Sequence, residues 1–179
     1  DFQNDESADL YNWGYITNNF FAPEGVYATS IDDESRIREL KALIAALHSR
    51  GIGVVLDVVY NHTGDTRRFD AFAPGYYYRK NPDGSLANGS ACGNDFNTEA
   101  PMARQLIIDS LKFWVTEYGV DGFRFDLMGL MDAETMRLAE RELRALKPGI
   151  LLYGEPWGIG ETPMQGAPMD KNNLASAGY

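Results

Sequence analysis

The octapeptide IGVVLDVV, residues 52–59, is β-branched and almost wholly apolar, and its one charged side chain is Asp57. Short runs of this kind are typical of strands in a parallel sheet that helices cover on both faces. We therefore expect residues 52–59 to form a strand that is buried on both faces. A carboxylate in such a strand needs a partner or an open end of the sheet, because an unpaired charge in a dry core is costly.

Apolar side chains before this strand recur at the spacing of one helical face. They are Ile37, Leu40, Ile44 and Leu47. Ser30 is the expected N-cap, with Asp33 at the third helical position, and Gly51 is expected to end the helix.

The alternation of helix and strand continues along the chain. Helices are expected at residues 101–118 and 133–147, and apolar strands at residues 120–127 and 150–155. Asp132 is a suitable N-cap for the last helix. This order predicts an α/β fold with a parallel sheet, and both doubly wound sheets and eight-stranded barrels fit it.

Two segments lack such periodicity. Residues 1–30 are rich in aromatic residues, Asn and Gly, and residues 60–98 are punctuated by Gly, Asn, Pro and Asp. A compact domain rarely carries about 40 residues of loop without a use for them. We therefore expect both segments to serve a functional site.

The composition excludes several classes of protein. The chain has 179 residues, 44% of them hydrophobic, which fits one globular domain. Its net charge of −10 disfavours nucleic acid as a partner, and no apolar run approaches the about 18 residues of a membrane span. Cys92 alone cannot form an internal disulfide. Motifs of serine hydrolases, P-loop proteins, dinucleotide-binding proteins and HExxH metalloproteases are absent.

Each expected strand carries one carboxylate near its end, namely Asp57, Asp126 or Glu155. Arg124 and Asp126 are two residues apart, so they point to the same face of their strand. Strand ends are where α/β folds place their sites. We expect the three acids and the arginine to converge, although a buried Arg124–Asp126 pair with two unrelated acids is the alternative.

Two carboxylates with one cation suit glycoside hydrolysis, which needs an ionised nucleophile and a protonated acid. Arg124 would keep Asp126 ionised. Glu155 has no basic neighbour in the sequence and precedes Pro156 and Trp157, so apolar surroundings would keep it protonated.

Aromatic side chains in the two loop segments are candidates for stacking on sugar rings, although some would simply belong to the core. They are Tyr11, Trp13, Tyr15, Phe20, Phe21, Tyr76, Tyr77 and Tyr78.

Three strings resemble, in order and in separation, the first three signatures of the alpha-amylase superfamily. They are DVVYNHT (57–63), GFRFD (122–126) and YGEPW (153–157). Longer strings resemble the type I pullulanases, a family of α-1,6-debranching enzymes: YNWGY (11–15), PGYYY (74–78), NGSACGN (88–94) and residues 121–129. Residues 13–23 are more similar to isoamylases.

The resemblance implies a role for each matching residue. Asp126 would be the nucleophile, Glu155 the general acid/base, and Arg124 the residue that orients Asp126. The substrate, an α-glucan such as pullulan, starch or glycogen, would be bound by Trp13, Tyr15, Asp57, His62 and Trp157. No cofactor is implied. Asn61 matches a position that ligates calcium in many amylases, but we predict no metal.

The resemblance also implies a (β/α)8 barrel, which needs about 250 residues. The three expected strands correspond to the third, fourth and fifth of that barrel. The fourth signature of the superfamily, a third acid beside a histidine, is absent because no histidine follows His62. We therefore expect residues 1–179 to be the central part of a catalytic barrel, inactive alone, with residues 1–30 and 60–98 as loops at its site.

Two further functions remain as alternatives. One is a glycogen-debranching or branching enzyme of the same superfamily. The other is a non-catalytic carbohydrate-binding module, which the presence of Arg124, Asp126 and Glu155 argues against, since binding alone gives no reason to bury these charges.

Overall fold

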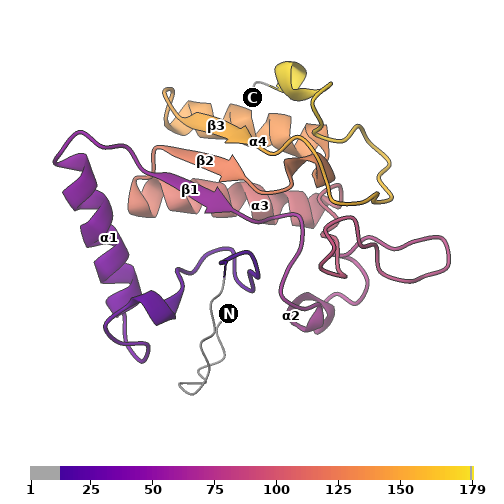
Figure 1. Ribbon diagram of the computed structural model, residues 1–179, viewed down its shortest axis with the longest axis horizontal. Coiled ribbons are helices and arrows are strands. Elements are labelled where there is room, and N and C mark those ends of the chain that lie inside the picture. The colour runs from indigo at the N-terminus through magenta and orange to yellow at the C-terminus, as the bar shows by residue number, and fades with distance from the viewer. Residues whose placement is uncertain (1–12, 178) are drawn as a thin grey trace.

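The computed structural model describes residues 13–177 and 179. Its centre is a parallel sheet of three strands in chain order, β1 (Val55–Val58), β2 (Gly122–Phe125) and β3 (Leu151–Gly154) (Figure 1). All three lie within the apolar runs that the sequence predicts as strands. The register sets Asp57 beside Arg124, and Arg124 beside Tyr153.

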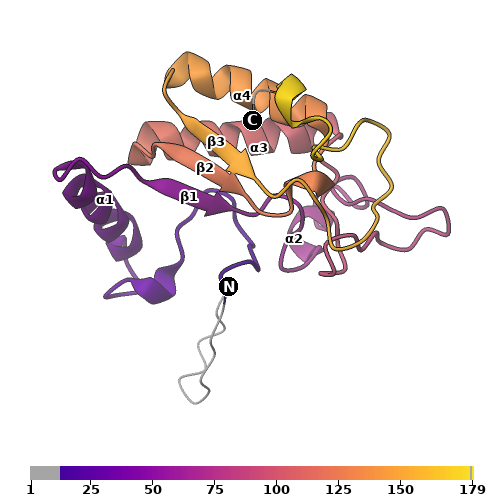
Figure 2. The same ribbon diagram turned by 45° about the horizontal axis from the view of Figure 1, so that its top comes forward.

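One helix precedes the first strand, and the other three lie in the connections between strands. They are α1 (Ser35–His48), α2 (Arg67–Asp70), α3 (Pro101–Phe113) and α4 (Ala133–Leu146). Shorter turns are η1 (Gly25–Tyr27), the π-helical η2 (Trp114–Tyr118) that prolongs α3, η3 (Met128–Leu130) and η4 (Leu174–Ala177). Helices α3 and α4 lie together on one face of the sheet, whereas α1 stands to the side of β1 (Figures 1 and 2). No helix in the described part of the chain is long and apolar enough to cross a membrane.

The core lies between the sheet and the helices α3 and α4. Alternate residues of the strands point into it, and Phe123, Phe125 and Leu152 are buried there. On the opposite face Val55, Leu151 and Tyr153 are 36%, 53% and 46% exposed. The expectation of a strand buried on both faces is therefore wrong for β1, because the described segments leave most of this second face open.

The helix boundaries follow local hydrogen bonds. The predicted N-cap at Ser30 is wrong, because α1 begins at Ser35, whose amide donates to Asp33 Oδ1 at 2.7 Å. Gly51 does follow the end of α1, with φ +71°. Asp132 caps α4 as predicted, since its carboxylate accepts from the amide of Thr135 at 2.9 Å.

Residues 60–98 pack their aromatic side chains together, and these side chains are continuous with the main core. Phe96 is fully buried, and the rings of Phe69, Tyr77 and Tyr78 pack around it. Tyr77 and Tyr78 are only 8% and 2% exposed, so the expectation that they offer stacking faces to a sugar is wrong.

The same correction applies to Phe20, which is buried in the main core. Its carbonyl accepts hydrogen bonds from Trp114 Nε1 at 2.9 Å and Ser110 Oγ at 2.6 Å, which tie the N-terminal segment to α3 and η2. Tyr76 remains partly exposed, and Tyr11 lies outside the described residues.

The carboxylate of Asp121 joins three segments at the end of the sheet where β2 begins. It accepts from Lys147 Nζ at 2.6 Å and from the amide of Val54 at 2.7 Å, and it lies 2.8 Å from His48 Nε2. Burial alone would raise the pKa of Asp121, but these three donors outweigh it and lower the pKa to about 2.

We expect this lowered pKa to govern acid stability. Because Asp121 binds a proton less readily in the folded chain than in the unfolded one, its contribution is present above about pH 4 and is lost as the pH falls toward 2. Asp121→Asn should lower the free energy of unfolding at pH 7 by about 1–2 kcal/mol, because charge-assisted hydrogen bonds weaken. Urea denaturation at several pH values measures this.

The substitution should also flatten the change of stability between pH 4 and pH 2. Asp109→Asn, on the exposed side of α3, is the matched control and should leave both quantities unchanged. A variant at Asp121 that kept the acid sensitivity of the parent chain would contradict this account.

Candidate active site

The guanidinium of Arg124 contacts three carboxylates at the end of the sheet. Its Nη1 lies 2.7 Å from Asp57 Oδ1 and 3.2 Å from Asp126 Oδ1, and its Nη2 lies 2.6 Å from Glu155 Oε1. Asp57 is in β1, Asp126 directly follows β2, and Glu155 directly follows β3. The four residues that strand parity predicts to converge therefore do so, and the alternative of two unrelated acids does not fit.

Arg124 is held as a permanent cation. Its side chain is mostly buried, and this burial would lower its pKa, but the charges of Asp57, Glu155 and Asp126 raise the pKa above its ordinary value. The guanidinium also lies 5.9 Å from the centre of the Tyr15 ring. The cation thus binds the three acids into one cluster.

Asp126 is buried, and Asn61 holds it from the β1 side. Asn61 Nδ2 donates to the backbone oxygen of Asp126 at 2.7 Å and to its Oδ2 at 3.2 Å. Burial raises the pKa of Asp126, and the charge of Glu155 adds to this, against the lowering effects of Asn61 and Arg124. Arg124 thus favours the ionised form of Asp126, as expected, but the effect of burial outweighs it in the direction of the shift.

Glu155 has two donors. Arg124 Nη2 donates to Oε1 at 2.6 Å, and the amide of Leu127 donates to Oε2 at 3.1 Å. The expectation of apolar surroundings for Glu155 is therefore wrong, because the neighbouring strand supplies the basic residue that its sequence neighbours lack. Leu127 adopts the left-handed conformation, with φ +41° and ψ +47°.

Tyr15 and His62 extend the cluster toward the N-terminal segment. Tyr15 OH donates to Asp57 Oδ2 at 3.0 Å. His62 Nε2 lies 2.8 Å from the carbonyl oxygen of Tyr15, and its Nδ1 lies 2.6 Å from Asn61 Oδ1. Burial lowers the pKa of His62, against the opposing effects of the Tyr15 carbonyl and the charge of Asp126. Both residues are thereby connected to the carboxylates.

The two tryptophans that are expected to bind substrate take no part in the hydrogen bonds described above. Trp13 and Trp157 are 75% and 55% exposed, so both rings face solvent. The segment after Trp157 is tied to the loop of residues 60–98, since Gly89 O accepts from the amides of Ile159 at 3.1 Å and Gly160 at 2.8 Å.

Sequence reasoning missed two contributions to the cluster. The resemblance presents Asn61 only as a position that ligates calcium in many amylases. In the structure its side-chain amide donates a hydrogen bond to Asp126. Its place directly after a strand, beside His62, is a signal that could have indicated this. Leucine rarely adopts the left-handed conformation, so the sequence gives no indication of it at Leu127.

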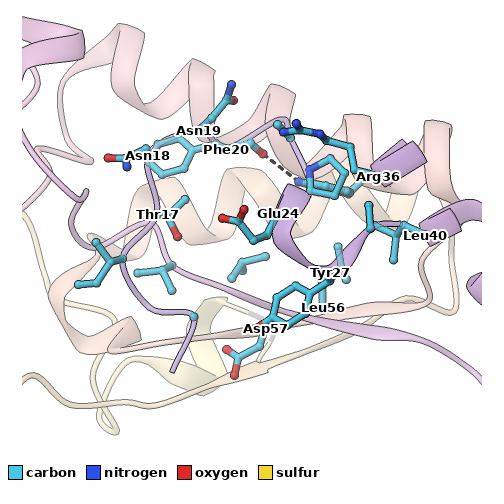
Figure 3. A pocket seen from close by; sticks show the side chains of 18 of the residues that line it. Thr17, Asn18, Asn19, Phe20, Glu24, Tyr27, Arg36, Leu40, Leu56 and Asp57 are labelled. Carbon is cyan, nitrogen blue, oxygen red and sulfur yellow. Dashed lines mark hydrogen bonds between the residues drawn. The ribbon is translucent and has the colours of Figure 1, made fainter. Parts of the chain in front are cut away.

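A groove of about 750 Å³ lies between α1, residues 14–28 and β1, beside the carboxylates and not over them. Asp57 lies at its edge (Figure 3). Its apolar lining includes Tyr27, Leu40 and Leu56. Within residues 13–177 and 179, no group of three or more His, Cys, Asp or Glu side chains is arranged to hold a metal ion.

No family model matches the chain. It is 45% identical over 159 residues to a pullulanase of Bacillus subtilis. The matched region covers 87% of this chain and 22% of that relative. Among solved structures, a pullulanase from Bacillus acidopullulyticus is 50% identical with a TM-score of 0.89, over 92% of this chain and 21% of its own.

A second solved structure, the pullulanase from Paenibacillus barengoltzii in complex with maltohexaose and α-cyclodextrin, is 44% identical with a TM-score of 0.89. It covers 93% of this chain and 26% of its own. The chain thus spans about a fifth of the length of the curated relative and a fifth to a quarter of the solved ones. Over most of its length, the chain is similar in both sequence and fold to one segment of the pullulanases.

Proposed function

We propose that the chain carries the nucleophile and the general acid/base of a retaining glycoside hydrolase of the pullulanase type, which cleaves α-1,6 linkages in pullulan, starch or glycogen. The observation that carries the proposal is the contact of one guanidinium with both Asp126 and Glu155. The resemblance to pullulanases, one of them in complex with maltohexaose, supports an α-glucan substrate.

In this proposal Asp126 attacks the anomeric carbon and forms a glycosyl-enzyme intermediate, while Glu155 protonates the leaving oxygen. Glu155 then takes a proton from the water that releases the sugar. Arg124 holds both carboxylates at one guanidinium. Asp126 can then meet the anomeric carbon of the glycosidic bond while Glu155 meets its leaving oxygen. The permanent charge of Arg124 also offsets the cost of holding two acids close together.

The substrate-binding side chains follow from the same cluster. Asp57, Tyr15 and His62 would surround the sugar ring whose bond is cleaved, because they are linked by hydrogen bonds to one another or to Arg124. Trp13 and Trp157 are exposed and are therefore the candidates for stacking on neighbouring sugar rings.

We further propose that the three strands belong to a (β/α)8 barrel, as its third to fifth strands, and that residues 1–179 are the central part of that domain. The exposed side chains of Val55, Leu151 and Tyr153 would then face the interior of the barrel. The groove between α1 and β1, whose lining includes Leu40, Leu43 and Leu56, would then lie beside the preceding strand (Figure 3).

We expect the complete enzyme to retain the anomeric configuration. Asp126 and Glu155 follow adjacent parallel strands, which are about 4.8 Å apart. This spacing suits a nucleophile and leaves little room for the water of an inverting enzyme. Proton NMR of the first product from pullulan should show the α-anomer. An initial β-anomer would contradict the assignment of Asp126.

We expect the complete enzyme to prefer α-1,6 over α-1,4 linkages by at least about tenfold in kcat/KM, which corresponds to about 1.4 kcal/mol. The carboxylates meet only the scissile acetal, so the loops that carry Trp13 and Trp157 must supply the preference. An α-1,6 linkage has one more rotatable bond, and rigid aromatic faces offset the cost of ordering it.

Initial rates on pullulan and on linear amylose measure this preference. Trp13→Ala and Trp157→Ala should reduce it, whereas Phe72→Ala, another exposed aromatic residue, serves as the control. Faster cleavage of amylose than of pullulan by the parent enzyme would refute the debranching assignment.

The 179-residue chain alone should release no reducing sugar from pullulan above a blank without protein. It contains no counterpart of the third acid beside a histidine that the superfamily resemblance implies, and one face of its sheet is open. The complete protein, assayed at the same molar concentration, is the positive control. Sustained turnover by the chain alone would refute the barrel assignment.

A further inference from the structure

We propose that Leu127 is a positioning residue for Glu155, through a backbone amide that its left-handed conformation directs at the carboxylate. The inference rests on the proposed function for the role of Glu155. Its structural part stands on the described contacts alone.

The chain changes direction abruptly at Leu127. The amide of Asp126 still donates to the carbonyl of Val58 at 3.0 Å, as in a sheet. At the next residue φ is +41° and ψ is +47°, and the amide of Leu127 donates to Glu155 Oε2 at 3.1 Å. The carbonyl of Leu127 then accepts from the amide of Leu130 at 2.9 Å, which closes the turn.

This conformation is unfavourable for leucine, because the Cβ atom approaches the following carbonyl. Backbone in this region persists where the surrounding structure holds it, and it is concentrated at functional sites. The Leu127 side chain is buried, which supplies that constraint. Of the two non-glycine residues with positive φ in the described chain, Leu127 is the one that bonds a candidate catalytic side chain.

The same turn also fixes the backbone of Glu155. The amide of Gly129 donates to the carbonyl oxygen of Glu155 at 3.0 Å. A Cβ atom at Gly129 would lie 2.6 Å from the backbone of Trp157, so the two segments approach as closely as glycine permits. One turn therefore holds both the main chain and the side chain of Glu155.

The consequence is a fixed relation between the candidate nucleophile and the candidate acid. Arg124 holds Oε1 of Glu155, and Leu127 holds Oε2. Without the amide, the carboxylate is free to turn about its contact with Arg124. Asp126 and Leu127 are successive residues, so a single peptide unit sets the placement of Glu155 relative to Asp126.

The sharpest test replaces Leu127 by its α-hydroxy acid in the complete enzyme. The resulting ester lacks the N–H donor, keeps every side chain, and weakens the Asp126 carbonyl as the acceptor for Asn61. A weaker hold on Asp126 would slow both substrates below, whereas a misplaced Glu155 slows only the one whose leaving group needs a proton. We expect kcat on pullulan to fall about tenfold, because the acid is misplaced. Hydrolysis of α-maltotriosyl fluoride, whose leaving group needs little protonation, should stay within about twofold of the parent rate.

The matched control is the same replacement at Met131, whose amide donates to the carbonyl of Met128 at 2.9 Å in the adjoining turn. It should not change the ratio of the two rates. Equal losses on both substrates at position 127, an unchanged rate on pullulan, or the same selective loss at Met131 would each overturn the inference.

Two side-chain variants separate the backbone from the packing. Leu127→Ile keeps the apolar volume but disfavours the left-handed conformation, so it should reproduce the selective loss on pullulan. Leu127→Gly loses the side chain but accepts that conformation, so the ratio of the two rates should stay near that of the parent. The reverse order would contradict a role of the backbone.

A measurement without turnover distinguishes failure of the inference from failure of the proposed function. In Glu155→Ala, the amide proton of Leu127 should move upfield in the NMR spectrum and exchange with solvent faster than in the parent. Glu161→Ala, a neighbouring exposed glutamate, is the control and should leave it unchanged. An unaffected signal in Glu155→Ala overturns the inference, whereas absent pullulan cleavage with a displaced signal overturns the proposed function alone.

Discussion

The site depends on one guanidinium that three strands share. Arg124 is in the central strand, and its partners are supplied by β1, by the residue after β2 and by the residue after β3. A buried carboxylate is tolerated only with a partner, so Asp126 and the mostly buried Glu155 depend on this cation, whereas Asp57 is partly exposed. The parallel register, which sets Asp57 directly beside Arg124, is therefore also the geometry of the site.

Much of this arrangement could be predicted from the sequence, because strands have a fixed period. Two residues per repeat place Arg124 and Asp126 on one face, and apolar runs such as residues 52–59 identify the strands. The expectation that Tyr77 and Tyr78 stack on a sugar is wrong, because both side chains are buried. Aromatic residues in a loop can equally form its core. Only the three-dimensional packing around Phe96 separates the two cases.

The electrostatic environment of Asp126 and Glu155 is harder to predict from the sequence than the positions of these residues. Sequence neighbours indicate a basic partner for Asp126 and none for Glu155, but Arg124 binds Asp126 on its own strand and also Glu155 across to the next strand. The direction of the pKa shift at Asp126 depends on burial and on the charge of Glu155, and neither is a local property of the sequence. The backbone of Leu127 is a further case, since a turn and not a residue preference determines it.

The shared cation leaves the cluster electrically unbalanced. Three carboxylates face one guanidinium, so even with one of the acids protonated the group carries a surplus of negative charge in a partly buried place. Coulomb attraction is stronger there than in bulk water. In the proposed hydrolase, such a site would bind a sugar ring that is becoming an oxocarbenium ion better than the neutral ring of a glucan, and this difference in affinity would lower the reaction barrier.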